Sequence, residues 1–121
     1  MRYVDGYVLP VPKKNLKIYQ KLARKAGTIW KKYGALEYVE CVADDLKSNW
    51  TTLKFPGTVQ CKPTEAVLFS FVIFTSRKHR DTVNAKVMKD PLMNDPKMKD
   101  MPMPFDMKRM VYGGFKAIVD M

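Results

Sequence analysis

The sequence predicts an α+β protein of the ferredoxin-like class, with elements in the order β-α-β-β-α-β. Three observations predict it: two segments with helical periodicity, one strongly apolar segment typical of a central strand, and shorter strand-like segments around them. This order gives a four-stranded antiparallel sheet with two helices on one face. At 121 residues the chain has the length of one domain, and we expect residues 1–121 to form a single one.

The first half of the chain supplies a strand, a helix and a second strand. Residues 3–11 are rich in Tyr and Val, and prolines close this strand. Within residues 15–33, apolar residues recur at spacings of three and four, which predicts a helix with its lysines on the opposite face. Gly34 provides a stop for that helix. Residues 35–43 are β-branched and aromatic and predict the second strand.

The central strand and the second helix have the clearest signals. Residues 66–75 are apolar on both faces except at Ser70, as expected of a strand that is covered on both sides. Ser76 is a natural N-cap for a helix predicted over residues 77–88. Residues 108–115 predict the last strand.

Two connections are irregular. Residues 46–63 contain prolines and a glycine, and we expect extended pieces only near residues 51–55. Residues 90–105 combine prolines with methionines, which predicts a short turn of helix followed by a packed loop. The methionines from Met88 to Met110 could form an adaptable pocket wall or a soft-metal site, but we favour a packed, flexible core because no cysteines or histidines cluster with them.

The charge of the chain is concentrated on the first predicted helix. The net charge is +10, and eight basic residues with no acid lie between Lys13 and Lys32. Six of them are candidates for contact with a phosphate backbone or another anion: Lys13, Lys14, Lys17, Lys21, Arg24 and Lys25. The chain shows no RNP-like aromatic strand and no GXXG loop, so we favour a solvated helix face over RNA or DNA binding.

Several functions and locations are disfavoured. Nothing resembles a secretion signal or a membrane span, and we expect no membrane association. Cys41 and Cys61 are too few for a disulfide framework, which favours free buried thiols and a cytoplasmic protein. His79 is the only histidine, so no metal site is predicted and Ser70 has no activating base. The two consecutive glycines Gly113 and Gly114 lack the spacing of a phosphate-binding loop.

Candidate functional residues come from charged positions inside predicted strands. Asp5, Glu40 and Arg109 are such residues, and burying an unpaired charge is costly. They could line a cavity, together with Tyr112. The alternative, which we favour on residue type alone, is that the charged side chains face solvent or form ion pairs between chains.

The predicted fold leaves one face of the sheet uncovered. A small domain with an exposed apolar sheet face tends to aggregate, and pairing two such faces is the simplest remedy. We therefore expect a homodimer in which two sheets enclose a shared barrel.

Several long motifs resemble the YbaA-like family, a domain of unknown function numbered 1428, over nearly the whole chain. They are Tyr3-Val4-Asp5-Gly6, Val67 to Ile73, Arg80-Asp81-x-Val83-Asn84-Ala85-Lys86-Val87-Met88-x-Asp90-Pro91, and Met103-Pro104-Phe105-Asp106-x-Lys108-Arg109-Met110-x-Tyr112-Gly113-Gly114-Phe115. The resemblance implies a small bacterial protein with the dimeric α+β barrel form of the ferredoxin-like fold. It brings no established activity, cofactor or catalytic residue. The chain departs from the pattern at Phe71, where tryptophan is more usual, and within residues 48–60.

Two functions remain open at this level. The first is that the dimer holds a small organic molecule in its barrel, lined by Asp5, Glu40, Arg109 and Tyr112, with cofactor-free oxygenase- or isomerase-like activity as an extension by analogy of fold. The second is that a non-enzymatic protein binds RNA or another anion through its basic first helix. The sequence does not decide whether the protein is an enzyme, and we predict no cofactor.

Overall fold

The computed structural model describes residues 1–99 and 102–121. Two long helices, α1 (Leu16–Lys32) and α3 (Arg77–Met88), accompany the strands β1 (Tyr3–Pro12), β2 (Glu37–Val42), β3 (Glu65–Phe74) and β4 (Val111–Lys116). The shorter elements are η1 (Lys13–Asn15), α2 (Phe55–Thr58), α4 (Pro96–Lys99) and η2 (Met107–Arg109). The four strands form one sheet in the order β2-β3-β1-β4, with antiparallel neighbours throughout.

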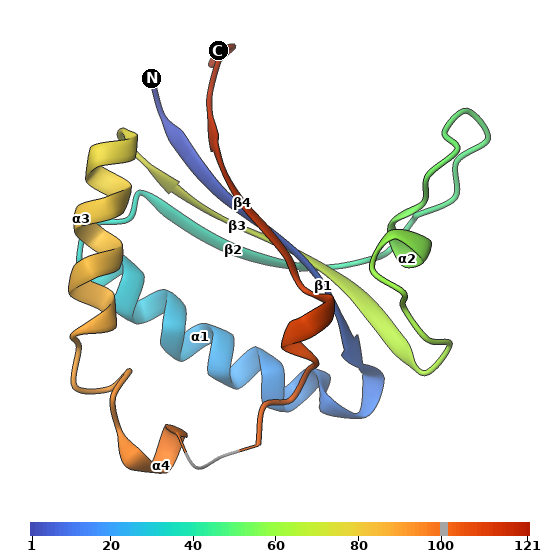
Figure 1. Ribbon diagram of the computed structural model, residues 1–121, viewed down its shortest axis with the longest axis horizontal. Coiled ribbons are helices and arrows are strands. Elements are labelled where there is room, and N and C mark those ends of the chain that lie inside the picture. Colours follow the sequence, from blue (N-terminus) through green and yellow to red (C-terminus); the bar gives the residue numbers. More distant parts are fainter. Residues whose placement is uncertain (100–101) are drawn as a thin grey trace.

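Both long helices lie on the same side of the sheet, and the two termini lie side by side at one end of it (Figure 1). The backbone N–H of Ala117 donates to the carbonyl of Arg2, and the Arg2 guanidinium pairs with Asp120 at 2.7 Å. This arrangement confirms the predicted α+β, ferredoxin-like fold class. The predicted helices and strands agree with the observed ones to within a few residues, apart from the last strand.

Helix α1 packs closely on the sheet because its inner face carries small residues. Ala23 and Gly27 are buried there, and a Cβ atom on Gly27 would lie 2.7 Å from the ring of Tyr38. The helix ends where predicted: Gly34 follows with a φ of 113°, a left-handed conformation that glycine adopts without a steric penalty.

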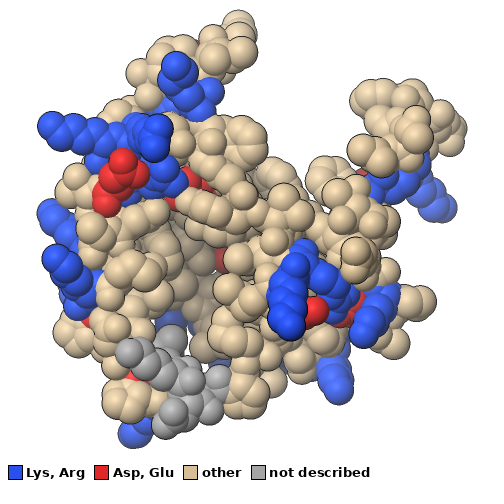
Figure 2. All heavy atoms as spheres, in the orientation of Figure 1, with Lys and Arg blue, Asp and Glu red and all other residues tan. Residues whose placement is uncertain are grey.

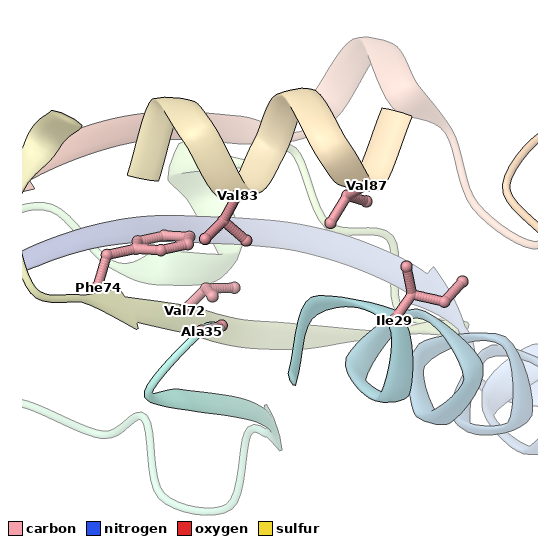
Figure 3. Close-up of a cluster of buried hydrophobic side chains, with 6 residues drawn as sticks. All are labelled: Ile29, Ala35, Val72, Phe74, Val83 and Val87. Carbon is pink, nitrogen blue, oxygen red and sulfur yellow. The ribbon is translucent and has the colours of Figure 1, made fainter. Parts of the chain in front are cut away.

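Helix α3 is fixed by its cap and by its apolar face. The Ser76 hydroxyl accepts a hydrogen bond from the backbone N–H of His79, which confirms the predicted N-cap. Val83 and Val87 then point from α3 towards Val72 and Phe74 of the sheet (Figure 3). This core holds α3 over one half of the sheet. A second cluster lies under α1 and includes Leu9, Val11, Tyr19, Ala23 and Leu68.

The last strand begins later than predicted, and the prediction that Arg109 lies inside a strand is wrong. The Asp106 carboxylate accepts a hydrogen bond from the backbone N–H of Lys108, and this turns the chain into η2. Arg109 therefore precedes β4. The extended pieces expected near residues 51–55 are also absent from the described residues, because bends there lead into α2 at Phe55.

The segment 90–105 agrees with its prediction where it is described. The short turn of helix is α4, and Phe105 packs edge-on against Tyr19 with 5.6 Å between ring centroids. Residues 100 and 101 lie outside the described residues.

The cysteines are free, but they are not buried as predicted. Cys41 is exposed and Cys61 is partly exposed, because Cys41 faces away from the helices and Cys61 precedes β3 in a connection. In the described part of the chain, no helix combines the length and the apolarity needed to cross a bilayer.

Neither long helix covers the opposite face of the sheet, while α2 and its connection lie at one end of the sheet (Figure 1). Register places the following apolar side chains on this uncovered face: Val4, Val8, Val39, Phe69, Phe71, Ile73, Val111 and Phe115. Phe69, Val111 and Phe115 are exposed in the single chain. The predicted uncovered, apolar face is therefore present.

Candidate functional site

One row of polar side chains crosses the sheet on the side of the helices. Tyr7 of β1 is paired in register with Tyr112 of β4 and with Ser70 of β3, and Ser70 is paired with Glu40 of β2. Directly opposed residues in an antiparallel sheet project from the same face. Each strand therefore contributes one hydroxyl or carboxyl group to a continuous row under the helices.

A cavity of about 370 Å³ lies over this row, between α1 and the sheet. Its floor includes Tyr7, Ser70 and Glu40. Its wall on α1 is formed by Leu22, Ala23, Ala26 and Trp30, and its remaining wall by Met93, Pro102, Met103, Phe105, Met107 and Met110. The space-filling view shows a hollow in this face of the molecule, between α3 and η2 (Figure 2). Small side chains on α1 opposite large aromatic ones leave this space open.

Glu40 is held by two phenols. The hydroxyl of Tyr19, on α1, donates to Oε1 at 2.8 Å, and the hydroxyl of Tyr38, on β2, donates to Oε2 at 2.7 Å. Burial, followed by the charge of Glu40, raises the pKa of both tyrosines well above the ordinary value, so they remain protonated donors at neutral pH. The carboxylate is therefore fixed in one orientation, with lone pairs left for a further donor.

Each of the two tyrosines that hold this carboxylate contacts another aromatic ring. Tyr19 contacts Phe105, and Tyr38 contacts Trp30 with 6.0 Å between ring centroids. All four rings line the cavity. The lining therefore combines one carboxylate with four aromatic rings.

Two hydroxyl groups in the floor are free to bind a ligand. Within the described residues, neither the buried Ser70 nor Tyr7 makes a side-chain hydrogen bond, although both line the cavity. Burial is the main cause that raises the pKa of Tyr7. The floor therefore offers two hydroxyl groups that a bound molecule could satisfy.

A second polar network lies beside the cavity, under α3. The Arg80 guanidinium donates to Asp5 at 2.9 Å and to the Tyr112 hydroxyl at 2.8 Å. Asn84 bridges Asp5 at 3.4 Å to the indole N–H of Trp30 at 3.0 Å, and Trp30 lines the cavity. Burial raises the pKa of Asp5, against the hydrogen bonds and the positive charge of Arg80. The network fixes one wall of the cavity without entering it.

Arg109 does not line the cavity and instead forms an ion pair between two elements. Its guanidinium makes two hydrogen bonds of 2.7 Å to the carboxylate of Glu65 and one to Asp106. The paired arginine lowers the pKa of Glu65 to about 2. This two-bond ion pair ties η2 to the start of β3.

The four residues proposed from sequence thus occupy different positions. Glu40 lines the cavity, while Asp5 and Tyr112 lie beside it and contact Arg80. Tyr112 also stacks on the cavity residue Tyr7, with ring centroids 4.9 Å apart. Register puts Asp5, Glu40 and Tyr112 on the helix-facing side, so a barrel formed on the opposite face would not contain their side chains.

Sequence reasoning missed the partners of these residues. Tyr19 falls within the helix predicted over residues 15–33, and Tyr38 within the strand predicted over residues 35–43, but neither was a candidate site residue. A usable signal was the set of small residues Ala23, Ala26 and Gly27 on the sheet-facing side of α1, since small side chains opposite aromatic ones indicate either close approach or space.

The basic residues of the first helix lie at the surface. All eight are exposed. Lys31 donates to the carbonyl of Leu36, and Lys32 pairs with Asp90 at 3.3 Å. The other six form no ion pair within the described residues: Lys13, Lys14, Lys17, Lys21, Arg24 and Lys25.

The fold and the cavity define a small α+β protein of ferredoxin-like topology, with a lined space between its first helix and its sheet. The chain belongs to the family described as "Protein of unknown function (DUF1428)", which matches residues 2–107. It is 42% identical over 122 residues to the "Uncharacterized protein YbaA" of Escherichia coli strain K12, with 99% of each chain covered. The protein of the same description from Shigella flexneri gives the same values.

These relatives confirm the family resemblance, and their descriptions name no activity. A solved structure, "De novo designed protein Foldit4", aligns with a TM-score of 0.46 and 8% identity over 97% of this chain and 99% of that chain. A likeness at that level carries no argument about function.

Proposed function

We propose that this protein binds a small, mostly apolar organic molecule in the cavity between α1 and the sheet. The observation that carries the proposal is the cavity itself, at about 370 Å³. Ligand sites in proteins generally measure about 300–1,000 Å³ and combine apolar walls with a few oriented polar groups. Here the oriented groups are Glu40, Ser70 and Tyr7.

The methionines support a binding role for this wall. Met93, Met103, Met107 and Met110 line the side of the cavity away from α1. Methionine is unbranched and polarisable, so it adapts to ligands of different shape. A wall of this kind suits entry and closure around an organic molecule better than a rigid one does.

The proposal includes a homodimer formed through the opposite face of the sheet. Apolar side chains from all four strands share that face by register, and Phe69, Val111 and Phe115 among them are exposed in the single chain. Gly6 and Gly113 are paired on this face, and the ring of Phe115 lies over both of them and presents an apolar surface to a second sheet. The dimer would bury this face, and the cavity of each chain would lie on the other side of its sheet, away from the interface. The cytoplasmic location of the protein remains a prediction.

The proposed function is binding of an organic molecule, and a reaction of the bound molecule would be an additional function. Isomerase- or oxygenase-like chemistry without a cofactor needs a proton acceptor beside the bound molecule. Glu40 is the one carboxyl side chain among the described lining residues, and its orientation is fixed by Tyr19 and Tyr38.

A variant that fills the cavity tests the proposal. Ala26→Leu adds three carbon atoms to the α1 wall and keeps a good helix former. Thermal-shift screening of a library of small organic fragments should find stabilisers of the wild-type protein that no longer stabilise Ala26→Leu. The matched control is Ala85→Leu on the exposed side of α3, which should keep them. Fragments that stabilise all three proteins equally would count against a ligand in this cavity.

The alternative function is binding of RNA or another polyanion to the first helix. Six exposed cations without ion-pair partners in the described residues favour it. Phosphate contacts make affinity fall steeply with salt, while binding in an apolar cavity changes little. Fluorescence anisotropy with labelled single-stranded RNA at low salt should show binding that Lys17→Glu, Lys21→Glu and Arg24→Glu together abolish. No binding at low salt would reject this function.

A further inference from the structure

The formal charge in the described lining of the cavity is negative only. Among the described residues that line it, Glu40 is the one with a formal charge, and no lysine, arginine or histidine takes part. The excess positive charge of the chain lies instead on exposed side chains at the surface. Arg24 and Lys31 line an adjoining pocket that also contacts Tyr19, Tyr38 and Glu40, but both are exposed side chains, and exposed charges are strongly screened at physiological salt. Glu40 is therefore the one formal charge among the described residues that line the cavity itself.

The surroundings of Glu40 suit an organic cation. The rings of Tyr19, Tyr38, Trp30 and Phe105 line the same cavity as this carboxylate, and the negatively polarised faces of aromatic rings attract cations. Both phenols already donate to Glu40, so each carboxylate oxygen is oriented and keeps a lone pair for an ammonium N–H. The remaining walls are apolar and fit hydrocarbon substituents.

We infer that the ligand of this cavity is a hydrophobic amine, bound as its ammonium ion against Glu40 with its hydrocarbon part towards the methionine wall. The inference rests on the proposed function and makes it more specific. A carboxylate or phosphate ligand would bring a second negative charge close to Glu40 in a cavity whose described lining holds no cation, and such an arrangement is unfavourable in a partly buried site.

Three probes of similar size and different charge test the inference: 4-phenylbutylamine, 4-phenylbutan-1-ol and 4-phenylbutanoate. Calorimetric titration at pH 7 should show the amine binding about tenfold tighter than the alcohol, with the carboxylate weakest. In Glu40→Gln, which keeps the size and hydrogen-bonding capacity of the side chain, the amine should lose about tenfold in affinity while the alcohol changes by less than about threefold.

Two controls separate the possible results. Glu37→Gln removes an exposed acid of the same strand on the other face of the sheet and should leave the amine affinity unchanged. Retained binding of the alcohol shows that Glu40→Gln still has an intact cavity. If all three probes bind the wild-type protein with equal affinity, the inference is overturned and the proposed cavity stands. If none of them binds, the inference fails together with the proposed function. The order of the three affinities in the wild-type protein tests the inference even if Glu40→Gln does not fold.

Discussion

The carboxylate of Asp5 and the guanidinium of Arg80 form an ion pair at 2.9 Å, in which the Asp5 side chain is 0% exposed and that of Arg80 is 14% exposed. The two residues lie 75 positions apart in the sequence and join β1 to α3. The pair, with Asn84 and Tyr112, holds the wall next to the cavity.

Arg80→Met should destabilise the protein by about 3–5 kcal/mol at pH 7, because it leaves Asp5 buried without its counter-charge. Burial already raises the pKa of Asp5, so the native state is disfavoured as pH rises through that pKa. The deficit should therefore shrink at acidic pH, where Asp5 takes up a proton and no unpaired charge stays buried. Urea unfolding at both pH values measures it. Lys78→Met, an exposed change on the same helix, is the control, and an equal deficit at both pH values would contradict the account.

The stability deficit of Arg109→Gln should also fade as pH is lowered, in this case because Glu65 takes up a proton. The arginine lowers the pKa of Glu65 to about 2, so the pair stabilises the folded protein above the ordinary glutamate range and loses this effect as pH falls towards 2. The variant should be less stable than wild type at pH 7, because Glu65 then keeps its charge without the paired arginine. The difference from wild type should fade between pH 4 and pH 2 in urea unfolding. Lys108→Gln, its exposed neighbour, should change little, and a deficit that persists at pH 2 would rule out this mechanism.

Gly27→Ala should destabilise the protein, although alanine favours helices by about 1 kcal/mol over glycine. The new Cβ atom would lie 2.7 Å from the ring of Tyr38 and force it away from its position beside Glu40. We expect a net loss of about 1–3 kcal/mol in thermal or urea unfolding. Gly57→Ala, with no neighbour within 4 Å of the added atom, should be neutral or slightly stabilising. A stabilised Gly27→Ala would show that Tyr38 moves aside at no cost.

Phe115→Glu should produce a monomer if the uncovered face of the sheet pairs with a second copy. Phe115 is 63% exposed in the single chain and lies on that face, opposite Val4 in register. A charge there would be buried in the dimer without a partner. Light scattering after size exclusion should give the mass of a dimer for the wild-type protein and for Ile18→Glu, an equivalent change on α1. A wild-type monomer at micromolar concentration would remove the dimer from the proposal.

The sequence predicted the elements well because their signals are local. The spacing of apolar residues in α1, the cap at Ser76 and the uninterrupted apolar run of β3 each depend on residues close together in the chain. Arg109 was misplaced because one side-chain contact, from Asp106 to the backbone of Lys108, decides between a turn and a strand there.

The site was only partly predictable because it depends on register and on long-range contacts. Glu40 was correctly identified as a charged strand residue, but its meeting with Ser70 and Tyr7 depends on the pairing of three strands. The contact of Tyr19 with Glu40 further requires the rotation of α1 on the sheet. Local periodicity gives the buried face of a helix, but not which residue of another element lies opposite.

Methionine methyl groups provide the most direct test of the cavity. In protein labelled with ¹³C at the methionine methyl groups, four residues report on the lining, Met93, Met103, Met107 and Met110, while Met1, Met88 and Met121 lie elsewhere and are exposed. Titration with fragments that stabilise the protein should shift the signals of the four lining methionines in a saturable manner and leave the other three unchanged. Unchanged signals from the four lining residues in the presence of every such fragment would contradict a ligand-binding cavity between α1 and the sheet.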